Sequence, residues 1–122
     1  MTPRLLLAIA AAAPAIALAA ASTTTPAGTS DDTHAFSVRL APGAIHEECV
    51  KLKKLDLRRY QWSSDAAVDF NIHYHEGKEV FYPVKHDGVR KSEGKFRAHL
   101  TQDFCWMWTA KTLTKLDGKI EK

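Results

Sequence analysis

The chain has 122 residues, of which 45% are hydrophobic and 25% charged, and its formal net charge is +3 at pH 7. These values are ordinary for one globular domain. They include neither the strong positive charge of a nucleic-acid-binding protein nor a polybasic run suited to a membrane surface, so we expect no nucleic-acid partner.

The first residues, MTPRLLLAIAAAAPAIALAAA, have the pattern of a secretory signal peptide. One basic residue, Arg4, precedes an apolar run, and Ala19 and Ala21 suit the two specificity positions of an A-x-A cleavage site. The run is rich in alanine and contains Pro14, whereas a membrane-spanning helix needs about 20 strongly apolar residues. We therefore predict a signal peptide over residues 1–21 and a periplasmic or secreted protein that does not span a membrane after cleavage.

Residues 22–33, STTTPAGTSDDT, contain no aliphatic side chain larger than alanine. Such a segment cannot bury enough apolar surface to offset the entropy of ordering it. We predict a flexible spacer here and a single domain over residues 34–122. A domain of this size has a small core, which is marginally stable without a covalent cross-link.

Short apolar–polar alternations run through this domain and predict strands. In chain order they are AFSVRL, IHEECVKL, LDLRRYQW, AVDFNIHYH, EVFYPVKH, GKFRAHL and DFCWMWTA, and KTLTKLDGKIEK is a last strand or a short hairpin that turns at Asp117-Gly118. Between them, APGA is a predicted turn, EGK a hairpin connection and HDGVRKSEG a polar loop. Seven or eight short strands without a long helical period predict an all-β fold, a small antiparallel β-sandwich of jelly-roll type.

Pro83 lies within one of these predicted strands. Proline cannot donate a hydrogen bond to a ladder, so we expect its strand to lie at a sheet edge or to carry a bulge.

Cys49 and Cys105 are the only cysteines. In an exported protein the default state of such a pair is a disulfide, and closing this long loop would contribute roughly 4 kcal/mol in the chain-entropy model. The alternative is that one or both are thiolate metal ligands or redox-active. The sequence has no C-x-x-C motif, so a thioredoxin-like role lacks support.

The order of several motifs resembles the GOLD domain, the lumenal β-sandwich of eukaryotic Golgi cargo receptors. The matching motifs are FSVRL, IHEECV with Cys49, Val68-Asp69-Phe70-x-Ile72 and Phe104-Cys105-Trp106, over about residues 35–120. The resemblance implies a GOLD-like sandwich with a Cys49–Cys105 disulfide, and a habit of binding proteins or lipids. It supplies no catalytic residue. The receptors' coiled coil, membrane helix and tail have no counterpart here, so their trafficking role does not carry over.

Histidines are the main candidates for a metal site. His73 and His75 lie two residues apart on a predicted strand, on the face opposite its apolar residues, and a short turn at Gly77 would place them roughly opposite Tyr82 and Val80. Imidazole suits copper or zinc. Histidines of neighbouring strands could converge on this pair and complete a metal site, and the candidate ligands are then His73, His75, His86 and His99. The alternative is a set of solvated histidines on the wet face of a sheet.

Trp106 and Trp108 share one face of a strand and form a candidate aromatic ledge, which either is buried or binds a ligand. Cys105 and Met107 share the other face, which we expect to point into the core. The sequence has no serine nucleophile motif, no glycine-rich phosphate loop and no H-E-x-x-H motif. We therefore predict a non-catalytic binding module, not an enzyme, with copper or zinc as the alternative ligand.

Overall fold

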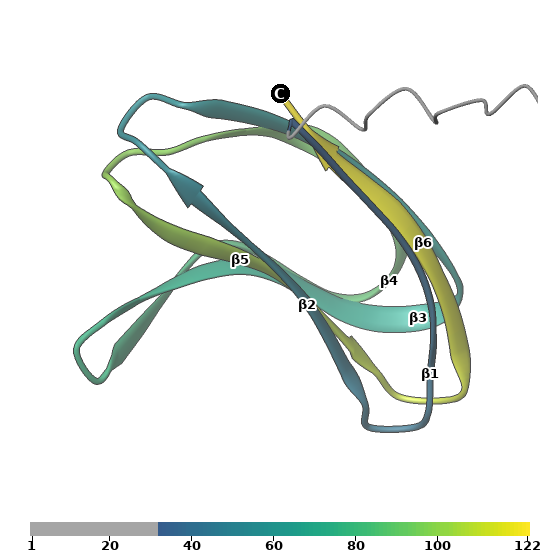
Figure 1. The fold of residues 1–122 in the computed structure, drawn as a ribbon. Coiled ribbons are helices and arrows are strands. Elements are labelled where there is room, and N and C mark those ends of the chain that lie inside the picture. The colour runs from purple at the N-terminus through teal and green to yellow at the C-terminus, as the bar shows by residue number, and fades with distance from the viewer. Residues whose placement is uncertain (1–31) are drawn as a thin grey trace, which may run out of the picture.

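The computed structural model describes residues 32–122, which form six antiparallel strands and no helix (Figure 1). The strands are β1 (Thr33–Leu40), β2 (Ile45–Leu52), β3 (Leu57–Glu76), β4 (Glu79–Arg97), β5 (Gln102–Ala110) and β6 (Thr114–Glu121). The all-β antiparallel prediction is confirmed. The predicted signal peptide and most of the predicted spacer lie outside the described residues. Within the described part of the chain, no helix is long and apolar enough to cross a membrane.

The strands number six, not seven or eight, because two pairs of predicted strands are each one long strand. LDLRRYQW and AVDFNIHYH join in β3, and EVFYPVKH and GKFRAHL join in β4. The predicted polar loop HDGVRKSEG is therefore strand, and Glu93 and Lys91 within it pair with Gln61 and Ser63 of β3. Composition alone indicated a loop, but a strand with one wet face tolerates polar residues, so the ladder partner decided the conformation.

The β3–β4 hairpin closes as predicted. Glu76 pairs with Glu79 across a two-residue turn, and Gly77 takes a φ of 59°, which only glycine adopts without strain. His75 pairs with Val80, as expected from a short turn.

Pro83 lies at an irregularity on a sheet edge. The β3–β4 register shifts between Ile72 and Tyr74, where His73 alone stands opposite Tyr82 and Pro83. Among residues 32–122, β4 pairs only with β3, so no strand of this part of the chain covers its other edge. Both expectations for this proline are thus met, because the missing N–H is needed neither at the bulge nor on the free edge.

β3 is shared by two layers of the sandwich (Figure 1). Its residues 59–64 pair with β6 and its residues 68–73 pair with β5, while β4 follows its other edge. β1 adds to β6 and β2 adds to β5. Between the two parts of β3 the chain bends, and the Ser64 hydroxyl donates to the Ala66 carbonyl at 2.7 Å.

Aromatic side chains from both layers form the core. Trp62 lies 5.2 Å from Phe70 and 6.1 Å from Trp108 between ring centroids, and Phe36 lies 4.7 Å from Trp108. Such pairs add about 0.5–1.5 kcal/mol each beyond the burial of their area. Other fully buried side chains are Leu52, Val68, Ile72, Phe104, Trp106, Leu116 and Ile120.

The C-terminal segment is one strand, β6, and Asp117-Gly118 lies within it rather than at a turn. Gly118 pairs with Phe36 on one side and Trp62 on the other. A Cβ atom there would lie 2.5 Å from Phe36 Cζ and 2.8 Å from Trp62 Cβ. The Asp-Gly dipeptide suggested a turn, but this glycine makes room for two aromatic side chains.

Candidate functional site

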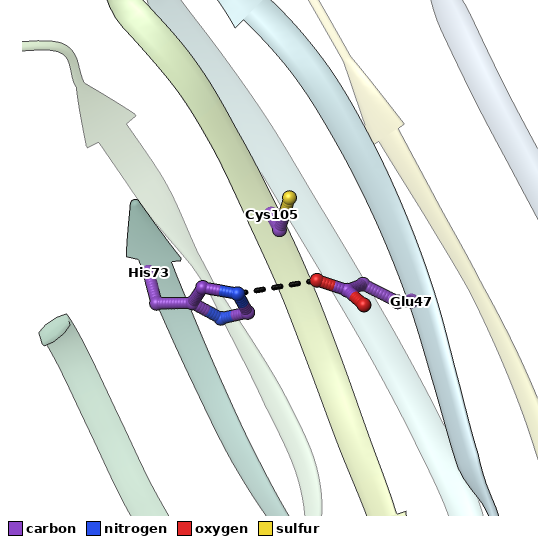
Figure 2. Close-up of side chains that lie close together, drawn as sticks. All are labelled: Glu47, His73 and Cys105. Carbon is purple, nitrogen blue, oxygen red and sulfur yellow. Dashed lines mark ion pairs between the residues drawn. The ribbon is translucent and has the colours of Figure 1, made fainter. Parts of the chain in front are cut away.

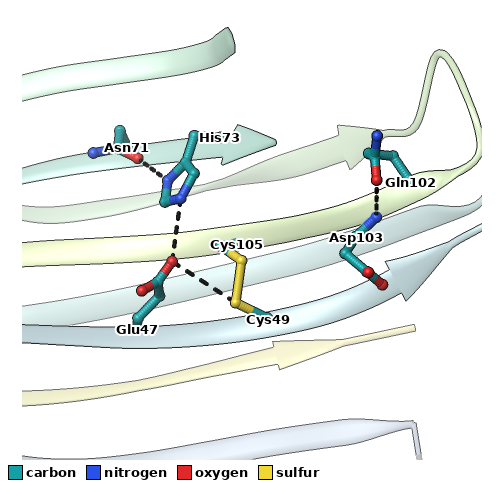
Figure 3. The surroundings of a disulfide bond; sticks show 7 residues. All are labelled: Glu47, Cys49, Asn71, His73, Gln102, Asp103 and Cys105. Atoms are coloured by element: carbon teal, nitrogen blue, oxygen red, sulfur yellow. Dashed lines mark hydrogen bonds and ion pairs between the residues drawn. A yellow bond between two sulfur atoms is a disulfide. The ribbon is translucent and has the colours of Figure 1, made fainter. Parts of the chain in front are cut away.

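The disulfide between Cys49 and Cys105 is present and joins β2 to β5 (Figure 3). The two cysteines are register partners, so the bond links neighbouring strands of one layer. Cys105 is buried and Cys49 is exposed. The bond therefore lies on the outer face of this layer, within reach of solvent.

Polar side chains gather beside this disulfide. We call Glu47, Asn71, His73 and the two cysteines the outer-face cluster. The Nε2 atom of His73 lies 3.1 Å from Glu47 Oε1, and its Nδ1 atom lies 2.8 Å from Asn71 Oδ1 (Figures 2 and 3). The same Glu47 oxygen lies 3.8 Å from Cys49 Sγ. The cluster thus spans the three neighbouring strands β2, β5 and β3.

Sequence reasoning did not select Glu47 and Asn71 as site residues. The available signal was spacing, since Glu47 precedes Cys49 by two residues and Asn71 precedes His73 by two. Residues two apart on a strand share a face. What the sequence did not provide was the order of the strands, which brings the two pairs together across β5.

His73 points to the outer face, as its strand phase predicted, but it is only 4% exposed. Its neighbours are the rest of the cluster, His75 with ring centroids 5.2 Å apart, and Tyr82 at 5.8 Å. Burial lowers the pKa of His73 below its ordinary 6.5; the Glu47 carboxylate acts in the opposite direction, and His75 adds to the lowering. The net direction favours a neutral imidazole, which is the form that binds metals.

The structure does not bring the four candidate histidines together. His75 lies next to His73 but is exposed. His86 is the register partner of Phe70, which occupies the strand phase opposite to that of His73. His99 lies apart from the other three histidines, and its Nε2 atom is 3.2 Å from the hydroxyl of Tyr74.

The predicted aromatic ledge does not exist as a binding surface, since Trp106 and Trp108 are both 0% exposed. They pair in register with Ile72 and Phe70 of β3 and share the inner face with them. The expected orientation of β5 is therefore reversed: its tryptophans face the core, and the face that holds Cys105 points outward. Tryptophan buries more apolar area than cysteine or methionine, which explains the preference.

A groove of about 820 Å³ lies over the other layer. Its lining includes Lys91 and Lys119 as well as Glu93 and Asp117. The charges of the two signs balance, so the groove selects neither an anionic nor a cationic ligand.

Comparison with known proteins gives a fold but no family. No family model matches the chain, and no curated protein matches it. Among solved structures, it is similar to PliG of Aeromonas hydrophila, a periplasmic inhibitor of g-type lysozyme, with a TM-score of 0.53 and 7% identity over 74% of this chain and 85% of that one. A de novo designed double-stranded β-helix gives a TM-score of 0.42 and 15% identity over 72% of this chain and 96% of that one.

The likeness to PliG supports an all-β, sandwich-like fold. Membership of the GOLD family remains a sequence-based hypothesis.

Proposed function

We propose that this chain is an exported, non-catalytic module that binds a protein partner through the end of the β3–β4 hairpin. The observation that carries the proposal is three consecutive exposed apolar residues next to the turn. Val80, Phe81 and Tyr82 are 38%, 36% and 48% exposed. The hairpin projects away from the rest of the sandwich at the lower left of Figure 1.

Successive strand residues point to opposite faces, so this segment presents apolar side chains on both sides of the hairpin. Phe81 is held in place by stacking on Tyr74 at 5.1 Å between ring centroids, and Lys85 lies 5.5 Å above the ring of Tyr82. The free edge of β4 runs alongside them. Exposed apolar groups on an unpaired edge favour aggregation unless a partner covers them, and aromatic residues are the usual anchors of protein interfaces.

Three further observations support an exported binding module. The disulfide is of the kind that persists in oxidising compartments. The first 21 residues have the pattern of a signal peptide. A likeness of fold to a periplasmic lysozyme inhibitor supplies a precedent for protein binding by such a sandwich, although fold alone does not imply function.

We also infer that the sandwich is GOLD-like. This inference rests on the sequence motifs around Cys49, Val68 and Cys105. In the structure these three residues lie on β2, β3 and β5, which are neighbours in the sheet in the order β2-β5-β3. A partner in this reading is a protein or a lipid, and the exposed hairpin favours a protein.

The test compares wild type with Val80→Ser/Tyr82→Ser, which leaves the stacked Phe81 in place. Each protein is immobilised and exposed to periplasmic and secreted proteins of the producing cell, and to purified g-type lysozyme as the first defined candidate. Loss of one aromatic anchor costs about 2 kcal/mol or more, so the double variant should bind the retained partner at least about 30-fold more weakly.

Leu113→Ser is the matched control, because Leu113 is apolar and 68% exposed but lies outside the hairpin. It should retain wild-type affinity. The proposal is wrong if no protein is retained, or if the hairpin variant and the Leu113 variant bind the partner equally well.

A further inference from the structure

We propose that the outer-face cluster binds a divalent transition metal, zinc above all, when Cys49 and Cys105 are thiols instead of a disulfide. Glu47, His73 and Cys105 each offer one ligand atom, and these three atoms lie within 4.8 Å of one another (Figure 2). Across residues 32–122, no other group of three or more histidine, cysteine or acidic residues meets this distance. None of these ligands is one of the exposed apolar residues that carry the proposed protein binding, although Tyr82 packs beside His73 with ring centroids 5.8 Å apart.

The donor atoms match zinc chemistry. Thiolate, imidazole and carboxylate bind Zn²⁺ at about 2.0–2.3 Å in a tetrahedron, which places the ligand atoms about 3.3–3.8 Å from one another. The Oε1 atom of Glu47 already lies 3.1 Å from His73 Nε2 and 3.8 Å from Cys49 Sγ. Cys49 therefore supplies the fourth ligand, once its sulfur is free to move away from that of Cys105.

Asn71 orients the His73 imidazole in the way that a hydrogen-bond acceptor usually orients a metal-ligating histidine. A ligating histidine commonly donates its second ring N–H to an acceptor, which fixes the orientation of the ring. The Nδ1 atom of His73 lies 2.8 Å from Asn71 Oδ1, so Nδ1–H donates to the amide oxygen. The lone pair of Nε2 then faces the Glu47 carboxylate. Two electron-rich atoms at this distance require a proton or a cation between them, and a metal ion satisfies both.

The disulfide and the metal compete for the same two sulfur atoms. A dithiol reductant transfers two electrons and two protons to the S–S bond, which gives two thiols, and the dithiol itself becomes a disulfide. The metal ion then displaces the two thiol protons as it binds. Cys49 is exposed, so a reductant can reach the bond from solvent. The cluster thus alternates between a cross-linked, metal-free form and a reduced, metal-bound form.

The test uses protein purified after export. One half is reduced with a phosphine, freed of reductant without oxygen, and both halves are titrated with Co²⁺ as a spectroscopic probe and with Zn²⁺ by calorimetry. The reduced protein should bind one ion per chain and show sulfur-to-cobalt charge-transfer bands with tetrahedral d–d bands. The oxidised protein should bind more than about 100-fold more weakly, because losing two ligands exceeds the cost of losing an outer hydrogen-bond partner.

Three variants of the reduced protein sharpen the result. His73→Ala should abolish the cobalt spectrum, and Asn71→Ala should weaken binding by about 10–100-fold. His86→Ala is the matched control, since it removes an exposed histidine outside the cluster, and it should change nothing.

Equal binding by the oxidised and reduced proteins overturns the proposal, and so does unchanged binding in His73→Ala. Reduction also removes a stabilising cross-link, so the near-ultraviolet circular dichroism of the tryptophans is recorded in parallel. If the reduced chain has lost this native signal, added Zn²⁺ must restore it, because metal binding and folding are coupled. Failure of Zn²⁺ to restore the signal also refutes the site.

Discussion

Gly118 gives a direct test of how the two layers pack, because β6 passes close to two aromatic side chains at this residue. A Cβ atom added there would lie 2.5 Å from Phe36 Cζ, 2.8 Å from Trp62 Cβ and 3.0 Å from the Gln61 carbonyl oxygen. Carbon atoms in favourable contact stand about 3.5–4.0 Å apart. Two of these three atoms belong to the backbone or are attached to it, so they cannot rotate away, and β3 must move relative to β6.

The expected effect of Gly118→Ala follows from two opposing contributions. Overpacking of this kind costs about 1–3 kcal/mol. Replacing a glycine within a strand would by itself gain about 0.5–1 kcal/mol of backbone entropy. Because the contacts are short and rigid, the overpacking lies at the upper end, and we expect a net loss of about 2 kcal/mol. In a domain of this size the melting temperature should fall by about 8–16 °C.

Gly94→Ala is the matched control. A Cβ atom at Gly94 would approach the Tyr60 hydroxyl at 2.8 Å, but this is the far end of a half-buried side chain that can turn aside. Thermal unfolding followed by circular dichroism should show a change below about 4 °C for this variant. The packing argument is refuted if Gly118→Ala melts within this range of wild type, or if both variants are destabilised equally.

Two further predictions concern the outer-face cluster. Replacing both Cys49 and Cys105 with alanine should lower the free energy of unfolding by about 4 kcal/mol, which is the chain-entropy value for cysteines separated by 56 residues. Urea denaturation measures this free energy. A loss below about 1 kcal/mol would show that the β2–β5 ladder suffices by itself. The second follows from burial, which lowers the pKa of His73 below its ordinary 6.5. The unfolded chain then binds this proton more readily than the folded one, so metal-free wild type should lose stability as the pH falls from about 6.5 toward the folded-state pKa. His73→Gln should flatten this part of the curve, and a variant curve parallel to that of wild type contradicts the assignment.

Local sequence determined where most strands lie. Period-2 alternation found IHEECVKL, which is β2 without change, and most of β1 and β5. The glycine of the short turn predicted the hairpin at Gly77. The missing N–H of Pro83 predicted an edge or a bulge, and the structure contains both. The cysteine pair was predicted from its number and its compartment and is a disulfide. Each of these features depends on a few neighbouring residues or on a simple count.

Tertiary pairing decided the rest. Alternation shows that Trp106 and Cys105 point to opposite faces of β5, but not which face is inside; the register against Ile72 of β3 settled that. The polar run HDGVRKSEG became strand because β3 continues opposite it.

The outer-face cluster is the clearest case of tertiary control. Glu47 lies on β2 and His73 on β3, consecutive strands along the chain that do not pair, and β5 inserts between them in the sheet. Short-range patterns carry no information about which distant strand inserts there, because that choice is made by the burial of side chains from the whole sandwich. The sequence therefore supplied the donor atoms of the cluster, and the order of strands in the sheet placed them within reach of one ion.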